Sequence, residues 1–121
     1  MGADPRRSLG AAGEALAAAW YERRGYQVVD RNWRTRGGEL DLVVQAPRLL
    51  VFCEVKSRRT NTFGAPIEAV TVAKQRRIRV LATEWMSHRT IPRATQVRFD
   101  VVSVRLRAGE PPQLDVVEAA F

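Results

Sequence analysis

The stretch "GGELDLVVQAPRLLVFCEVKSR", from Gly37 to Arg58, decides the fold of this sequence. Its apolar residues form two runs, 39–45 and 49–57, which are typical of β-strands joined through residues 46–49. Charged residues interrupt these runs where a core strand normally has valine or leucine: Glu39, Asp41, Glu54 and Lys56. The stretch therefore predicts an apolar hairpin whose charges need a physical explanation.

The pairing of the two strands decides where these charges lie. An antiparallel pairing across residues 46–49 places Asp41 opposite Glu54, and the same register places Glu39 opposite Lys56. Because strand side chains alternate between faces, all four charges then share one face. Facing carboxylates repel each other, and a shift by one residue would separate Asp41 from Glu54. The pattern predicts either a cation site or a solvated face of ion pairs, each worth less than about 1 kcal/mol.

A divalent cation would offset the repulsion between the carboxylates. Hard oxygen ligands without histidine or cysteine suit Mg²⁺ or Mn²⁺. Asp41 and Glu54, with a carbonyl such as that of Val55, would leave positions open for water and a phosphate oxygen. Lys56 would orient or deprotonate the attacking water, or stabilise charge on the phosphate. Only Lys56 and Lys74 are lysines among 20 basic residues, which favours a specific role for a lysine at 56 but is also compatible with chance.

The rest of the sequence predicts a mixed α/β domain of order αβββαββ spanning residues 1–121. Asp4–Pro5 or Ser8 would begin a helix over 7–24, and Gly25 would end it. A strand over 26–33 precedes the hairpin. The later elements expected are a helix from Pro66 to about His88 and strands over 97–104 and 114–121.

Composition favours a polyanionic partner. The net charge is +7 and the isoelectric point is about 10.9, which points to nucleic acid, with general solubility as the alternative. No run of 18 apolar residues suggests a membrane span, and the N-terminal segment does not read as a signal peptide. Cys53 is the single cysteine, expected as a buried apolar residue in a cytoplasmic protein.

Basic side chains lie at the ends of the acidic strands and on the second helix. We expect those at the strand ends to contact a nucleic-acid backbone: Arg34, Arg36, Arg58 and Arg59. Lys74 and Gln75 are candidates of the same kind on the helix, where a solvated helix face is the alternative. Trp33 could stack on a base, although packing at the rim of the core is the simpler interpretation.

The hairpin resembles the signature of the PD-(D/E)xK nucleases. Asp41 matches the first acid of that signature, and Glu54-Val55-Lys56 matches its E-x-K element, although Leu40 stands where many members have proline. Glu14 resembles the helical acid that Holliday-junction resolvases of this fold add to the metal site. The resemblance implies a restriction-endonuclease-like fold, a metal held by Glu14, Asp41 and Glu54, and catalysis by Asp41, Glu54 and Lys56.

A closer likeness covers nearly the whole chain. The blocks "GEALAAAWYERRGYQVVDRNWRTRGGELDLV", "FCEVKSR", "AVTVAKQRRI" and "RFDVVSV" are similar to the YraN-like family of small bacterial proteins. That likeness implies a restriction-endonuclease-like fold and a nuclease role, but no particular substrate. The charges of the hairpin and the basic loops add the expectation of a Mg²⁺- or Mn²⁺-dependent endonuclease acting on DNA, more than on RNA, with branched or structured DNA among the candidate substrates. The alternatives are a nucleic-acid-binding protein without turnover and a protein-interaction domain. The likeness to resolvases also raises a homodimer as a prediction.

Overall fold

The computed structural model describes residues 5–59 and 70–121, and its element order is αβββαββ, as the sequence predicts. This mixed α/β order is consistent with a restriction-endonuclease-like fold. The elements are α1 (Pro5–Arg23), β1 (Gln27–Thr35), β2 (Gly38–Ala46), β3 (Leu49–Arg58), α2 (Val72–Ser87), β4 (Gln96–Arg105) and β5 (Gln113–Val117).

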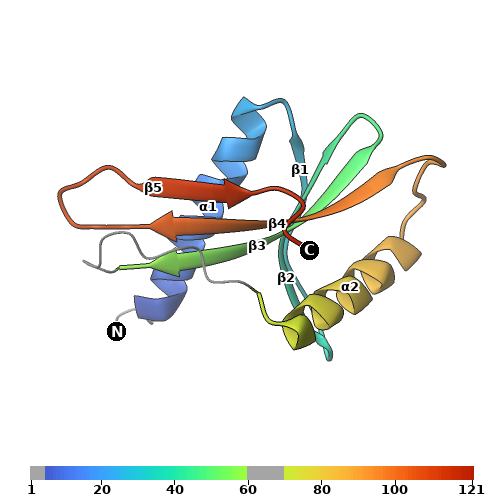
Figure 1. Cartoon of the computed structure of the whole chain (residues 1–121), viewed down its shortest axis with the longest axis horizontal. Coiled ribbons are helices and arrows are strands. Elements are labelled where there is room, and N and C mark those ends of the chain that lie inside the picture. Colours follow the sequence, from blue (N-terminus) through green and yellow to red (C-terminus); the bar gives the residue numbers. More distant parts are fainter. Residues whose placement is uncertain (1–4, 60–69) are drawn as a thin grey trace.

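The five strands form one mixed sheet in the order β1-β2-β3-β4-β5. Only β3 and β4 pair in parallel, and the other neighbours are antiparallel. A parallel pair needs a crossover connection, and α2 lies in the segment that joins β3 to β4. Helices α1 and α2 lie on opposite faces of the sheet (Figure 1).

Both faces of the β2–β3 hairpin are buried. Val43, Phe52 and other side chains pack with α2 on one face. Val44, Val51 and their neighbours pack with α1 on the other face. The expectation of one apolar face and one charged face is therefore wrong for most of the hairpin. Two-sided burial also explains why these strands read as continuous apolar runs.

The helix boundaries differ from the sequence expectation in two places. Ser8 lies inside α1 and does not cap it, while Asp4 lies outside the described residues. Gly25 follows α1 with a φ of 88°, a left-handed conformation that suits glycine after a helix. Helix α2 begins at Val72, after Thr71, whose hydroxyl accepts a hydrogen bond from the backbone N–H of Lys74 at 3.2 Å.

The remaining differences are local. Pro66, the expected start of the second helix, lies outside the described residues. Strand β1 continues to Thr35, two residues beyond the expected end, and β5 ends at Val117. The β2–β3 connection has two residues, not four, because Ala46 already pairs with Leu49.

A buried carboxylate ties the C-terminal segment to the sheet. Asp100 on β4 has no exposed surface, and it accepts hydrogen bonds from the hydroxyl of Tyr21, the guanidinium of Arg98 and the backbone N–H of Ala119. The C-terminal Phe121 stacks on Phe99 at a centroid distance of 5.2 Å. Asp100 therefore has the structural role that its position between apolar residues predicts.

Candidate functional site

The β2–β3 ladder ends where the acidic residues begin. The predicted register is confirmed for the pairs from Ala46–Leu49 to Leu42–Cys53. Beyond that point Asp41 and Glu54 are not a backbone pair, and the Oδ2 atom of Asp41 accepts a hydrogen bond from the N–H of Val55 at 2.9 Å. A side-chain carboxylate therefore bridges the two strands in place of a backbone carbonyl.

The backbone changes direction at the same point. Leu40 belongs to the apolar core between the sheet and α2, which we call the α2-side core. Leu42 belongs to the apolar core between the sheet and α1, the α1-side core. In a regular strand these two side chains would share a face, so the alternation breaks at Asp41. Across the β1–β2 ladder, Asn32 lies between the residues paired with Leu40 and Leu42 and has a φ of 50°. This irregularity coincides with Asp41, which lies between the two core residues.

Three carboxylates converge at this irregularity. One oxygen each from Glu14, Glu39 and Asp41 lies within 4.8 Å of the other two. The sequence placed Glu14 and Asp41 together and left Glu39 open between an ion pair with Lys56 and a part in the site. The structure brings Glu39 into the cluster and pairs its Oε2 atom with the Nε atom of Arg34 at 2.8 Å.

Close packing of α1 brings Glu14 to the cluster. Gly13, the preceding residue, is buried against β3. A Cβ atom at Gly13 would lie 2.9 Å from the Cβ atom of Ser57, and real Cβ atoms do not approach this closely. Only glycine lets α1 lie this near β3, so Gly13 sets the reach of the neighbouring carboxylate. Gly13 was not among the residues predicted from the sequence, although its place beside Glu14 was a visible signal.

Glu54 faces a cavity of about 210 Å³ beside the cluster. The lining comes from the start of β2, from β3 and from α2: Gly38, Glu39, Asp41, Glu54, Lys74, Arg77, Ile78 and Leu81. The Oε1 atom of Glu54, whose side chain is 10% exposed, lies 2.5 Å from the Nζ atom of Lys74. Glu54 therefore shares the cavity with Asp41 and Glu39, but its nearest charged partner is a lysine.

The crowding of acids changes their protonation. Burial, followed by the negative charge of Glu54, raises the pKa of Asp41 to about 8, although the hydrogen bond from Val55 opposes this shift. Burial also raises the pKa of Glu14, while a hydrogen bond from the Asn32 side chain lowers it. At neutral pH, Asp41 therefore holds a proton unless a cation replaces it.

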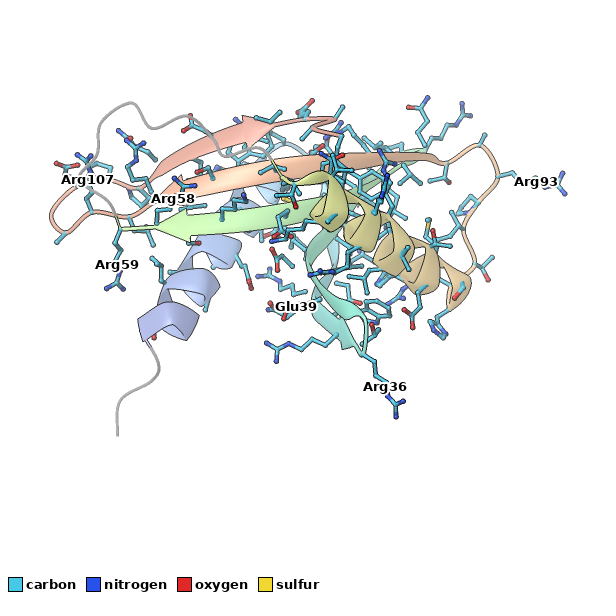
Figure 2. The ribbon with its side chains drawn as sticks, turned by 60° about the horizontal axis from the view of Figure 1, so that its bottom comes forward. Arg36, Glu39, Arg58, Arg59, Arg93 and Arg107 are labelled. Atoms are coloured by element: carbon cyan, nitrogen blue, oxygen red, sulfur yellow. The ribbon has the colours of Figure 1, made fainter. Side chains whose placement is uncertain are left out.

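The other predicted site residues take different places. Lys56 is half-buried on β3, two positions after Glu54. Arg36 lies at the tip of the β1–β2 hairpin, whereas Arg58 and Arg59 lie at the far end of β3 (Figure 2). The arginines flank the acidic cluster but do not form one group. Gln75 is not among the residues that line the cavity, and its side-chain amide donates to the carbonyl of Val70 at 2.8 Å.

Two features outside the cluster lack the same chemistry. A cavity of about 310 Å³ at the C-terminal end of α2 is lined by Trp85, Arg89 and ten further residues, none of them acidic. Cys53 is buried, and this burial raises the pKa of its thiol. It is an apolar core residue, as predicted.

Trp33 packs half-buried against the α2-side core, which agrees with the simpler interpretation of that residue.

Comparison with known proteins identifies the family. Residues 13–104 match the sequence model described as "Uncharacterised protein family UPF0102". The chain belongs to the UPF0102 family. A UPF0102 protein of Rhodococcus opacus is 48% identical over 114 residues, which cover 94% of this chain and 96% of the relative. A UPF0102 protein of Geobacter sulfurreducens is 41% identical over 120 residues, covering 99% and 93%.

Membership of UPF0102 confirms the YraN-like likeness of the sequence blocks. The match includes the elements that carry the acidic cluster, from Gly13 on α1 to the end of β3, and continues into β4. A further relative from Rhodococcus jostii is 50% identical over 114 residues. The names of these UPF0102 relatives state no activity, so the function has to be argued from the site. No helix among residues 5–59 and 70–121 is long and apolar enough to cross a membrane.

Proposed function

We propose that this protein is a Mg²⁺- or Mn²⁺-dependent endonuclease that hydrolyses phosphodiester bonds in DNA. The observation that supports the proposal most is the convergence of Glu14, Glu39 and Asp41, with Glu54 in the adjoining cavity. Basic side chains on either side of this cluster, and the net charge of +7, favour a polyanionic substrate. The PD-(D/E)xK resemblance implies Glu14, Asp41 and Glu54 as metal ligands. The cluster contains the first two together with Glu39, while Glu54 lines the adjoining cavity and pairs with Lys74.

The donor atoms of the cluster fit a hard divalent cation. Three carboxylate oxygens within 4.8 Å of one another repel each other, and the raised pKa of Asp41 reflects this crowding together with burial. All the donors are oxygens, which suits Mg²⁺ or Mn²⁺ better than zinc. Glu14, Glu39 and Asp41 would hold the cation, with Glu54 beside them. When bound, it would neutralise charge on the phosphate and make water a stronger nucleophile.

The side chains around the cluster divide the remaining tasks. Lys56 lies two positions beyond Glu54 on the same strand, where its ammonium would orient the attacking water or stabilise charge that develops on the phosphate. Lys74 holds the Glu54 carboxylate in place through their ion pair. The hydrogen bond from Val55 fixes the orientation of Asp41. Glu54 and Asp41 are thus held in position before substrate binds, which lowers the reorganisation needed in the transition state.

Cleavage assays test this proposal directly. The purified protein should cleave at least one member of a panel of labelled DNA structures, including duplex, nicked, flap and branched DNA, when Mn²⁺ or Mg²⁺ is present. Asp41→Ala, Glu54→Ala and Lys56→Ala should each reduce the rate by about 10²-fold or more. Arg93→Gln, at an exposed position far from the cluster (Figure 2), is the matched control and should cleave as the wild type does. Cleavage that persists in the Asp41 and Lys56 variants would refute the proposal.

The second candidate is a nucleic-acid-binding protein without turnover. The net charge and the arginines at the ends of β1 and β3 favour binding whether or not the acids support catalysis. Isothermal titration calorimetry separates the two candidates. Salt-dependent DNA binding together with no heat of Mg²⁺ or Mn²⁺ binding would favour the second candidate.

A further inference from the structure

The wall of the cavity opposite the acids is formed by one face of α2. Lys74 and Arg77 lie three residues apart on this helix, so they project from the same side, and both line the cavity. Arg76, between them, is exposed and is not among the lining residues. The helix therefore places two positive charges across from the carboxylates of β2 and β3.

In the described part of the chain, Arg34 and Lys74 each form an ion pair with an acid of the site, whereas Arg77 does not. Arg34 pairs with Glu39, and Lys74 pairs with Glu54. Within residues 5–59 and 70–121, no carboxylate lies at ion-pair distance from Arg77, although Glu39, Asp41 and Glu54 line the same cavity. Arg77 is therefore a cation in an acid-lined cavity that none of these acids neutralises.

The stem of Arg77 lies close to the start of β2 beside this cavity, although the residue as a whole is exposed. Gly38 begins β2 with a φ of 137°, and a Cβ atom there would lie 3.4 Å from the Cδ atom of Arg77. The same Cβ atom would lie 3.3 Å from Leu81. The absence of a side chain at Gly38 thus makes room for the Arg77 stem against the strand. A packed stem reduces the conformational entropy that the guanidinium loses when it binds a ligand.

We infer that Arg77 binds a phosphodiester group of a nucleic-acid strand next to the acidic cluster. A guanidinium offers two parallel N–H donors to two phosphate oxygens, and it keeps its charge at every physiological pH. Lys74 is committed to Glu54, so Arg77 supplies the uncommitted donor on this wall. The inference rests on the proposed function for the identity of the substrate, and it adds the residue that holds the substrate strand on the α2 side.

The four acids of the site favour a diester over a phosphate monoester. A monoester or inorganic phosphate carries up to two negative charges, whereas each diester in a strand carries one. The repulsion from Glu39 and Glu54 is therefore larger for the monoester. A strand also extends beyond the cavity to the arginines at the ends of β1 and β3, so its binding does not depend on one contact.

Fluorescence anisotropy with labelled DNA tests this role. The probes are a duplex and a single strand of the same sequence, titrated in EDTA at several salt concentrations, so that cleavage does not contribute. Arg77→Gln should weaken binding of at least one probe about tenfold and reduce the slope of log K against log salt by about one. Arg77→Lys should restore most of the slope. Arg76→Gln, at the adjacent exposed position, should change affinity less than about twofold.

Several results would overturn the inference. These are equal losses in Arg76→Gln and Arg77→Gln, an unchanged affinity in Arg77→Gln, or no DNA binding by the wild type. Inorganic phosphate or a 5′-mononucleotide that competes as well as an unlabelled oligonucleotide would overturn the choice of a phosphodiester. Failure of the wild type to cleave DNA with Mn²⁺ would refute only the proposed endonuclease, because the Arg77 effect is measured without metal. Circular dichroism of each variant excludes misfolding as the cause.

Discussion

Two carboxylates on neighbouring regions of the sheet, Asp100 and Asp41, have opposite environments. Asp100 is fully buried, yet its two oxygens accept hydrogen bonds from a tyrosine, an arginine and a backbone N–H group. Asp41 is less buried and has one backbone donor, from Val55. The carboxylates of Glu14 and Glu39 lie close to it, and Glu54 lines the same cavity. Donors surround one acid, and negative charges surround the other.

The difference teaches that burial alone does not mark a functional acid. A buried carboxylate with all its acceptors satisfied stabilises the fold, whereas acids that crowd together with fewer donors are candidates for a functional site. Cys53 pairs with Asp100 across the β3–β4 ladder, and Glu54 is the next residue on β3. The structural acid and the edge of the candidate site are thus one strand position apart in register.

Removal of Asp100 should have the largest effect on stability. Asp100→Ala leaves Arg98 and the hydroxyl of Tyr21 without their buried partner, which should cost about 3–5 kcal/mol of unfolding free energy in urea denaturation. Glu118→Gln is the control, because Glu118 is exposed and its oxygen lies 3.8 Å from Arg98. A loss below about 1 kcal/mol for Asp100→Ala would show that its hydrogen bonds do not hold the fold.

Metal binding should stabilise the folded protein through the acidic cluster around Asp41 and not through Asp100. At a free Mn²⁺ concentration one hundred times the dissociation constant, the wild type should gain about 2.7 kcal/mol at pH 8, seen as a higher melting temperature in differential scanning calorimetry. Glu14→Gln and Asp41→Asn should show little or no gain, because each removes an oxygen of the cluster. Equal gains in the wild type and in both variants would place the metal elsewhere.

The close approach of α1 gives a third test. Gly13→Ala should lose about 1–3 kcal/mol, because the added Cβ atom overlaps Ser57 and forces α1 away from β3. It should also weaken Mn²⁺ binding, since Glu14 is the next residue. Gly10→Ala on the same helix meets no atom within 4 Å and should stabilise by up to about 1 kcal/mol. Unchanged Mn²⁺ affinity in Gly13→Ala would separate the packing of α1 from the site.

The smallest effect expected is a pH-dependent gain in Asp41→Asn. The pKa of Asp41 is about 8 in the folded protein and 3.8 in its ordinary state, so the folded protein binds more protons between these values. Wild-type stability contributed by Asp41 is therefore largest at low pH and falls as the pH rises towards 8. Without metal, the advantage of Asp41→Asn over the wild type should grow by at least about 1 kcal/mol between pH 5 and pH 8. Urea denaturation at the two pH values measures it, and a constant difference would contradict the raised pKa.

Most of the fold follows from local patterns in the sequence. The helical spacing before Gly25, the two apolar runs of the hairpin and the later strands are confirmed, because side-chain period and turn residues are local properties. The register of the hairpin was also predicted correctly as far as Leu42 and Cys53. The start of α2 was harder to predict, because both Pro66 and Thr71 suit the beginning of a helix. In the structure Thr71 caps the helix.

The element order, and the position of Asp41, Glu54 and Lys56 on one hairpin, can be predicted from local sequence patterns. Three further features depend on how the elements pack: Glu39 joins Glu14 and Asp41, Lys74 pairs with Glu54, and Arg77 has no acidic partner among the described residues. The physical reason is that residue spacing sets direction within one element, whereas distances between elements depend on packing. A break in strand alternation at Asp41 and a glycine at position 13 set those distances here.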